Sequence, residues 1–310
     1  GNRATVITDS VNGTINRGYD SFDRLNSESG PQGSVGYEYD AAGRRTQMTV
    51  GTQAPAVYNY DNGNRLTSIV QGSETVGFNY DNANRRSSLT LPNGVTATYG
   101  YDNANELTGI SYAQANGTAI GTLSYGYDLA GRVSGEGGTL NTTAVASATT
   151  TGTFDANNRQ TSFNGTTQTF DADGNLTSDG VNTYVWNARN QLVQIEQGAS
   201  VVATYTYDAL GRRTSKQVGG ATETTFLYDG VNTAQETQNA TINPIFVGLG
   251  VDERFARNDV SGRTYFLTDA LNSTVGLTSS SGAWVQQYQY DPYGNLATAA
   301  TANNPYQYTG

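Results

Sequence analysis

Carboxylates and phenols are the only abundant side chains in this sequence that could do chemistry. The 310 residues include 27 Asp and Glu and 21 Tyr, but no His and no Cys, and the single Lys is Lys216. Without imidazole or thiol there is no Ser-His or Cys-His pair, no usual zinc or haem ligand set, and no side chain that titrates near neutral pH. Any catalysis would have to use carboxylates, Tyr, Ser, Thr or Lys216.

Two patterns of carboxylates resemble functional sites. The stretch "DADGN" places Asp171, Asp173 and Asn175 at alternate positions, as at the start of a calcium loop. No Glu follows at the twelfth position, so calcium is a weak alternative there. Recurring Asp residues could also form the carboxylate pair of a glycosidase. Their regular recurrence favours a role in turns, so we assign no catalytic residue, no metal site and no cofactor.

Charge and hydropathy exclude several other classes of function. The net charge of -10 argues against nucleic acid and against anionic membrane surfaces, which are bound by clustered Lys and Arg. No apolar run approaches the roughly 20 residues of a membrane-spanning helix. Residues 1–30 contain no apolar core of a signal peptide, so any targeting segment has been removed or lies outside this chain.

The Asp residues belong to a repeat. "YEYDAAGRR" at Tyr37 returns as "YNYDNGNRL", "FNYDNANRR" and "YGYDNANEL". Aligned on the Asp, thirteen copies follow one another, mostly at spacings of 20–22 residues, with Asn187 replacing the Asp in one copy. The copies start at Asp20, Asp40, Asp61, Asp81, Asp102, Asp128, Asp155, Asp171, Asn187, Asp208, Asp229, Asp269 and Asp291. A period of this length predicts an array of identical structural units.

The conserved columns of the repeat predict a strand that ends in a tight turn. The residue before the Asp is aromatic in twelve copies, and the residue two before that is aromatic in ten, so both rings lie on one strand face. The third residue after the Asp is Gly, Asn or Asp in all copies, the types that tolerate a left-handed backbone. The Asp predicts an Asx-turn, and the Gly or Asn predicts a type I turn with a bulge. Structural repeat positions are Tyr39, Asp40, Gly43, Arg44; Tyr60, Asp61, Asn64, Arg65; Tyr80, Asp81, Asn84; Tyr101, Asp102, Asn105; Tyr127, Asp128, Gly131; Tyr207, Asp208, Gly211; Tyr290, Asp291 and Gly294.

Two further features of the repeat concern the residues after the turn. Arg follows the left-handed position in seven copies, placed to pair with its own Asp or with that of a neighbouring copy. The next strand carries apolar residues three apart, as at Leu66 and Ile69 or at Leu107 and Ile110. Because a step of three breaks the strict alternation of a strand, we expect a β-bulge there.

The fold class is therefore all-β with almost no helix. Thirteen hairpins predict about 26 strands in one continuous antiparallel sheet, which must curl because long sheets twist. We expect a spiral shell or solenoid with its aromatic face inward. Repeats occupy residues 1–249, and residues 250–310 continue the same sheet. A Gly-, Thr- and Ala-rich loop insertion at 134–153 lengthens one unit, as a long surface hairpin or loop.

The units "YDAAGRR", "YDNGNRL" and "YDALGRR" resemble the YD repeats of the Rhs (rearrangement hotspot) family, which includes shells of insecticidal toxin complexes and teneurins. Residues 250–295 and "NPYQYTG" at 304–310 resemble the start of the Rhs-associated core. The resemblance implies a secreted or surface bacterial β-shell that encapsulates a C-terminal toxin or effector. It also implies a self-cleavage site further on, for which this chain has no counterpart.

The size of the sheet limits what this chain can enclose. About 26 strands at ~4.8 Å would make a ring about 40 Å across, too narrow inside for a folded domain of roughly 35 Å. We therefore expect a segment of a larger, non-enzymatic shell, whose partners are further repeats and the effector of the parent chain. One alternative is an extracellular filament or tube built from identical copies through sheet edges. Another is a sugar-binding adhesin using outward aromatics such as Tyr112 and Tyr306.

Overall fold

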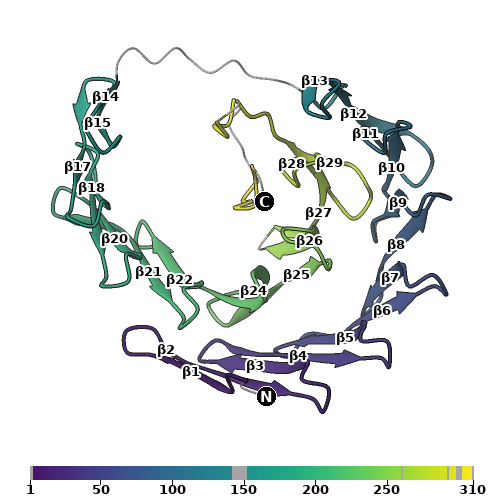
Figure 1. Cartoon of the computed structure of the whole chain (residues 1–310), viewed down its shortest axis with the longest axis horizontal. Coiled ribbons are helices and arrows are strands. Elements are labelled where there is room, and N and C mark those ends of the chain that lie inside the picture. Colours follow the sequence, from purple (N-terminus) through teal and green to yellow (C-terminus); the bar gives the residue numbers. More distant parts are fainter. Residues whose placement is uncertain (1–2, 142–151, 260, 292, 298–301, 309–310) are drawn as a thin grey trace. The chain divides into compact units, whose positions relative to one another are not determined.

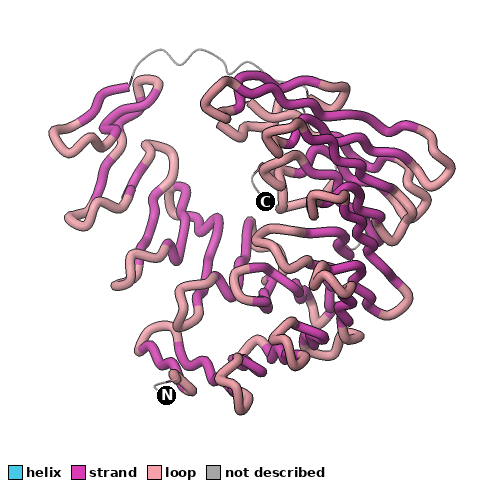
Figure 2. Tube along the Cα trace, turned by 45° about the vertical axis from the view of Figure 1, so that its right-hand side comes forward, coloured by secondary structure: helices cyan, strands magenta, loops and turns pink. Residues whose placement is uncertain are grey.

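The computed structural model describes residues 3–141, 152–259, 261–291, 293–297 and 302–308. These residues form strands, turns and loops, and none of them is helical, as Figure 2 shows by its strands and loops alone. The all-β class and the repeated antiparallel hairpins predicted from the sequence are confirmed. The described residues also contain no helix long and apolar enough to cross a membrane.

The strands follow one another in the sheets in chain order (Figure 1). The first sheet contains β1 (Val6–Asp9), β2 (Gly13–Tyr19), β3 (Leu25–Gly30), β4 (Gly33–Tyr39), β5 (Arg45–Val50), β6 (Ala56–Tyr60), β7 (Leu66–Gln71), β8 (Glu74–Tyr80), β9 (Arg86–Thr90), β10 (Thr96–Tyr101), β11 (Leu107–Ala113), β12 (Ala119–Tyr127) and β13 (Val133–Gly137). A small sheet contains β14 (Gly152–Phe154), β15 (Gln160–Phe163) and β16 (Thr166–Thr167).

The third sheet again has thirteen strands. It contains β17 (Thr169–Phe170), β18 (Leu176–Ser178), β19 (Thr183–Trp186), β20 (Leu192–Gln197), β21 (Ser200–Tyr207), β22 (Arg213–Val218), β23 (Thr224–Asp229), β24 (Asn232–Gln238), β25 (Thr241–Val247), β26 (Arg254–Asp259), β27 (Gly262–Thr268), β28 (Thr274–Thr278) and β29 (Trp284–Gln287). β25 and β26, on either side of residue 250, pair with each other.

The prediction of one continuous sheet is wrong, because the described strands divide into three. The first break lies between β13 and β14, on either side of residues 142–151, which fall outside the described part of the chain. The second lies in the extended segment 166–170, which pairs with β15 through its first half and with β18 through its second. Copies near Asp171 have the shortest spacing, so few residues remain for strands once the turns are formed.

The predicted loop insertion at 134–153 is only partly described. Residues 134–137 belong to β13, and residues 152–153 belong to β14, so both ends of the segment are strand rather than loop. The remainder, apart from residues 138–141, lies outside the described residues. The insertion as a long surface hairpin or loop stays a prediction, because most of the segment lies outside the described residues.

The predicted bulge is present at the expected place. Tyr60 pairs with Leu66 and Asn59 with Ser68, so Thr67 is the extra residue on its strand. The same shift occurs where Tyr101 pairs with Leu107, which leaves Thr108 as the extra residue. The bulge explains the apolar step of three, because it returns the next apolar side chain to the buried face.

The chain divides into two compact units. Unit 1 comprises Gly1–Gly36 and Ser147–Ile242, and unit 2 comprises Tyr37–Ala146 and Asn243–Gly310. The core of unit 2 lies between strands of the first and third sheets: Phe78 of β8 packs edge-on against Phe255 of β26, with ring centroids 5.8 Å apart. Ile69, Val76 and Leu267 have no exposed surface in that core.

Candidate functional site

Each repeat ends in a turn built by its Asp. In the copy at Asp40, one carboxylate oxygen accepts the backbone N–H groups of Ala42 and Arg44, both at 2.9 Å. The Gly43 N–H donates to the Asp40 carbonyl at 3.0 Å, and the Asp40 N–H donates to the Arg44 carbonyl at 3.0 Å. The turn is the Asx-turn and bulged hairpin that the repeat columns predict.

The left-handed position of the turn is occupied as predicted in twelve of the thirteen copies. Its φ values lie between 56° at Asn190 and 89° at Gly174. The residues are Asp23, Gly43, Asn64, Asn84, Asn105, Gly131, Asn158, Gly174, Asn190, Gly211, Asn272 and Gly294. In the copy at Asp229 the prediction is wrong: Asn232 pairs directly with Asp229, and Gly230 has the positive φ of 59°. A two-residue turn replaces the bulged one there.

The Arg that follows the turn pairs with the Asp of its own copy. The Arg65 Nε donates to the second oxygen of Asp61 at 2.7 Å, and its Nη2 lies at 2.7 Å from the same oxygen. The same pair forms at Arg24, Arg44, Arg85, Arg132, Arg159 and Arg212. The backbone N–H of Arg65, and next its side chain, hold the pKa of Asp61 below its usual value.

The same Arg also contacts the next copy, and this contact we call the joint. The Arg44 Nη1 donates to the amide oxygen of Asn64 at 2.8 Å, and its guanidinium lies 4.7 Å from the centre of the Tyr60 ring. Arg65 makes the same two contacts with Asn84 and Tyr80. Arg85 makes them with Asn105 and Tyr101. The sequence predicted a neighbouring Asp as the alternative partner, but the partner is the left-handed Asn.

A tyrosine ladder completes each joint, and the sequence analysis missed it. The Tyr80 hydroxyl donates to the carbonyl of Leu66 at 2.8 Å, in the preceding copy. Eight other rings donate in the same way to a backbone carbonyl: Tyr19 to Ala4, Tyr60 to Arg45, Tyr101 to Arg86, Tyr127 to Leu107, Trp186 to Leu176, Tyr207 to Leu192, Tyr228 to Arg213 and Tyr290 to Thr274. The sequence carries only a slight signal for it, because Phe occurs in both columns: at Phe154 and Phe170 before the Asp, and at Phe78, Phe226 and Phe266 in the earlier position.

The two aromatic columns therefore have different surroundings. Rings of the earlier column are buried at Tyr58, Phe78 and Phe226, with 3–4% of their surface exposed. Rings of the later column, among them Tyr80 and Tyr207, are half-buried and lie beside the turn. The expectation that both columns form the core is correct for six of the ten rings of the earlier column, while Tyr99, Tyr125, Tyr184 and Tyr205 are half-buried. It is wrong for the later column, because the hydroxyl must reach a strand-end carbonyl.

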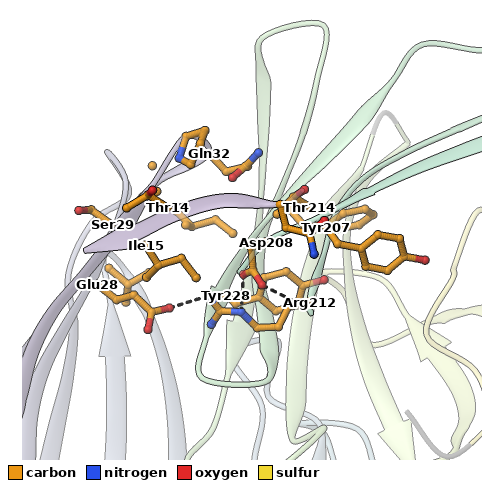
Figure 3. Close-up of a pocket in the computed structure, with 17 residues that line it drawn as sticks. Thr14, Ile15, Glu28, Ser29, Gln32, Tyr207, Asp208, Arg212, Thr214 and Tyr228 are labelled. Atoms are coloured by element: carbon orange, nitrogen blue, oxygen red, sulfur yellow. Dashed lines mark hydrogen bonds and ion pairs between the residues drawn. The ribbon is translucent and has the colours of Figure 1, made fainter. Parts of the chain in front are cut away.

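In unit 1 one joint extends into a cluster of charges (Figure 3). Arg212 contacts its own Asp208 at 2.7 Å and, through Nη2, Glu28 at 2.6 Å. Glu28 also pairs with Arg17 at 2.7 Å. Glu28 and Asp208 are buried, with 8% and 7% of their surface exposed. This ion cluster of Arg17, Glu28, Asp208 and Arg212 therefore fixes the segment 1–36 to the segment 147–242 within the unit.

The sequence matches the teneurin YD-shell family over residues 95–307 and the RHS repeat family over residues 19–55. The chain belongs to the teneurin YD-shell family. No curated protein matches it.

Solved structures share the YD-shell fold. The crystal structure of TcdB2-TccC3 without its hypervariable C-terminal region is 16% identical, with a TM-score of 0.68 over 97% of this chain and 21% of that chain. The Tc holotoxin pore of Photorhabdus luminescens is 16% identical, with a TM-score of 0.63 over 93% of this chain and 20% of that one. This YD-shell chain thus spans about a fifth of the length of these solved chains.

The weak calcium candidate is a YD turn in the structure. Both oxygens of Asp171 accept hydrogen bonds from Asn175, one from its backbone N–H at 2.8 Å and one from its side-chain amide at 2.9 Å. Asp173 is exposed. The described residues hold no group of three or more acidic side chains that could bind a metal ion.

The two tyrosines singled out for an adhesin do not face outward. Tyr112 is 4% exposed, and its hydroxyl donates to the Thr268 carbonyl at 2.7 Å. Tyr306 is 9% exposed. The expectation of outward-facing rings at these positions is wrong, because both lie outside the repeat columns yet pack inside unit 2 of the YD-shell.

Proposed function

We propose that this chain is a structural, non-catalytic segment of a β-shell in a secreted or surface bacterial protein. In the longer parent, the shell encloses a C-terminal toxin or effector. The partners of the segment are then further repeats and the enclosed effector. Residues 1–249 would supply repeats of the wall, and residues 250–310 would begin the Rhs-associated core.

The observation that carries this proposal is the joint. The functional columns of the repeat are used in turns, in Asp–Arg pairs and in hydroxyl-to-carbonyl bonds between successive copies. A side chain committed to such contacts is not available to a substrate. The structural role agrees with the family and with the shared fold of the Tc toxin structures.

Protection of the effector tests the proposal directly. The full reading frame would be purified and treated with a protease, and fragments of the C-terminal region would be followed by mass spectrometry. We expect that region to stay intact while exposed loops are cut. A matched chain with Gly211→Val, which strains one turn of the wall, should lose protection at a lower temperature. Rapid cleavage of the C-terminal region in the intact protein would contradict encapsulation.

A filament is the second candidate, because the strands at the ends of the sheets have an unpaired side. Among the described strands, β1 is the first of its sheet and pairs with β2 alone, and β29 is the last of its sheet and pairs with β28 alone. Open edges accept strands of another copy unless they are blocked. Electron microscopy of the purified chain distinguishes the two functions: fibres with a regular subunit rise support the filament, whereas single particles at high concentration contradict it.

A further inference from the structure

Unit 2 contains a cavity with an unusual balance of charge. Its volume is about 280 Å³, and its lining includes Glu136, Asp269 and Asp291 but no Lys or Arg. A neighbouring cavity of about 290 Å³ offers a contrast, since its lining includes the Arg86–Glu253 ion pair, with 2.8 Å between the charged atoms. The first cavity, which we call the acidic cavity, has no such ion pair in its lining, although Asp269 lines both cavities.

The two turn carboxylates of the acidic cavity belong to copies that lack the Arg. Where seven copies have Arg, the copy at Asp269 has Ser273 and the copy at Asp291 has Asn295. Asp291 is 8% exposed and accepts the Asn295 amide at 2.8 Å, while Asp269 accepts the backbone N–H groups of Leu271 and Ser273 at 2.8 Å. Neither carboxylate has a cationic partner among the described residues. Burial without a counter-charge raises the pKa of Asp269, whereas the side chain of Asn295 holds the pKa of Asp291 below its usual value.

Aromatic rings form the rest of the lining. Tyr288 and Tyr290 stack with an interplanar angle of 6° and centroids 6.3 Å apart. Tyr308 follows Tyr290 at 5.4 Å, tilted by 55°, and Tyr125 lies in the same cavity wall. Rings of this kind attract organic cations through their faces, most strongly where water is excluded.

A separate observation points to an absent ligand. Tyr288 is 2% exposed and lines the acidic cavity, and its buried hydroxyl makes no hydrogen bond in the described structure. Buried hydroxyl groups are nearly always satisfied, so an unsatisfied one calls for a partner. The side chain of Asn304 lies beside this hydroxyl and bonds the backbone N–H and carbonyl of Tyr306.

We propose that the acidic cavity binds an organic cation, an alkylammonium or guanidinium group, between the tyrosine rings and the carboxylates of Asp269 and Asp291. The cation supplies the counter-charge that Arg supplies in seven other copies. Its ammonium or guanidinium N–H groups, or a substituent hydroxyl, bond the Tyr288 oxygen. The source is either a free small amine or a basic side chain of a polypeptide, since both present the same group.

Calorimetric titration of the chain with two cations tests the proposal. Choline represents a free amine, and N-acetylargininamide represents a basic side chain. The control ligand is the uncharged tert-butyl analogue of choline, which has the same shape. We expect saturable binding of at least one cation and roughly tenfold weaker binding of the analogue. Binding of choline alone identifies a free amine, and binding of the arginine compound alone identifies a basic side chain. If neither cation binds, or if the uncharged analogue binds equally well, the proposal is overturned.

Matched variants locate the site. Asp269→Asn and Asp291→Asn keep the oxygen that the turn needs and remove the charge, so each should weaken cation binding by about tenfold. Tyr308→Leu, which removes one ring, should also weaken it. Asp61→Asn changes an Arg-paired turn outside the acidic cavity and should leave affinity unchanged. Thermal unfolding of every variant checks folding. Unchanged affinity in folded Asp269→Asn and Asp291→Asn proteins would overturn the proposal.

Discussion

The hydroxyl of Tyr80 lies 2.8 Å from the carbonyl oxygen of Leu66, fourteen residues earlier in the chain. Leu66 is the first residue of β7, directly after the preceding turn, and Tyr80 is the last residue of β8. The bond therefore ties the end of one copy to the beginning of the strand before it. Its recurrence at eight other positions makes it the most regular contact between copies.

Tyr80→Phe should lower the free energy of unfolding by about 0.5–1.5 kcal/mol, because the ring stays and only the bond to Leu66 is lost. Chemical denaturation with linear extrapolation measures the change. Tyr293→Phe is the matched control, since that ring is 81% exposed and should change nothing. Equal stability of the two variants would show that the ladder contributes nothing.

Gly211→Val should destabilise the chain on the order of 1–3 kcal/mol, because a branched side chain is strained at the left-handed φ of 80°. Gly135→Val is the control, at a strand position where an added Cβ meets open space. Both would be compared by thermal unfolding. If the melting temperatures of Gly211→Val and wild type coincide, the assigned role of the turn is wrong.

Phe78→Ala should cost about 3–5 kcal/mol, since the ring is 4% exposed and packs against Phe255 in the core of unit 2. Phe154→Ala removes a ring that is 59% exposed and should change stability by about 0.5 kcal/mol or less. Denaturant titration of the two variants measures the difference. A small effect at Phe78 would contradict the assignment of the earlier aromatic column to the core.

Glu28 and Arg212 should be energetically coupled. A double-mutant cycle with Glu28→Ala and Arg212→Ala should give a coupling of roughly 0.5–3 kcal/mol, because the pair is largely buried and shared with Asp208 and Arg17. The pair Arg132 and Asp128 is the control, as the Arg132 side chain is 80% exposed and its coupling should be about 1 kcal/mol or less. Strictly additive effects at Glu28 and Arg212 would show that the ion cluster does not join the two segments of unit 1.

Acid should unfold the chain through its turn carboxylates. The pKa values of Asp40, Asp61 and Asp81 are lowered in the folded protein, with backbone hydrogen bonding from the following Arg as the largest cause. A carboxyl with a depressed pKa stabilises the fold above its unfolded value of about 3.9 and loses that contribution as pH falls through the folded value. Asp61→Asn should therefore be destabilised at neutral pH and should converge with wild type in acid.

The contribution of Asp269 to the stability of the fold should change with pH in the opposite direction, because burial raises its pKa. A raised folded pKa gives stability below the unfolded value that is lost as pH rises through the folded one. Asp269→Asn should therefore be at least as stable as wild type at neutral pH, and the two should converge in acid. Melting temperatures between pH 3 and pH 8 measure both variants. Equal pH profiles for Asp61→Asn and Asp269→Asn would contradict the difference in their surroundings.

The features that depend on neighbouring residues could be predicted from the sequence. The Asx-turn at Asp40, the left-handed Gly43 and the bulge at Thr67 all follow from residue types within one hairpin. Their geometry is set by hydrogen bonds and backbone sterics over a few residues, so a local pattern is sufficient to predict them.

Contacts between segments that lie far apart in the sequence could not be predicted from it. Nothing in the repeat distinguishes Glu28 as the partner of Arg212, which lies 184 residues away. Burial of Tyr112 and the meeting of Asp269 with Asp291 in one cavity likewise depend on which strands of unit 2 pack together. The turn at Asp229 differs for a simpler reason: Gly230 permits a two-residue turn, and the repeat alignment hid that option.

The joint has a consequence for how such chains change length. A copy such as the one at Asp61 offers a carbonyl and an Arg to the copy after it and a ring to the copy before it. A copy of this kind, inserted between two others, would bond the same groups that its insertion separates. An in-frame duplication of one copy would leave no donor or acceptor stranded at either junction. Gain or loss of a whole copy should therefore change the stability of the fold little. Deletion of half a copy, in contrast, removes the contacts to both neighbouring copies.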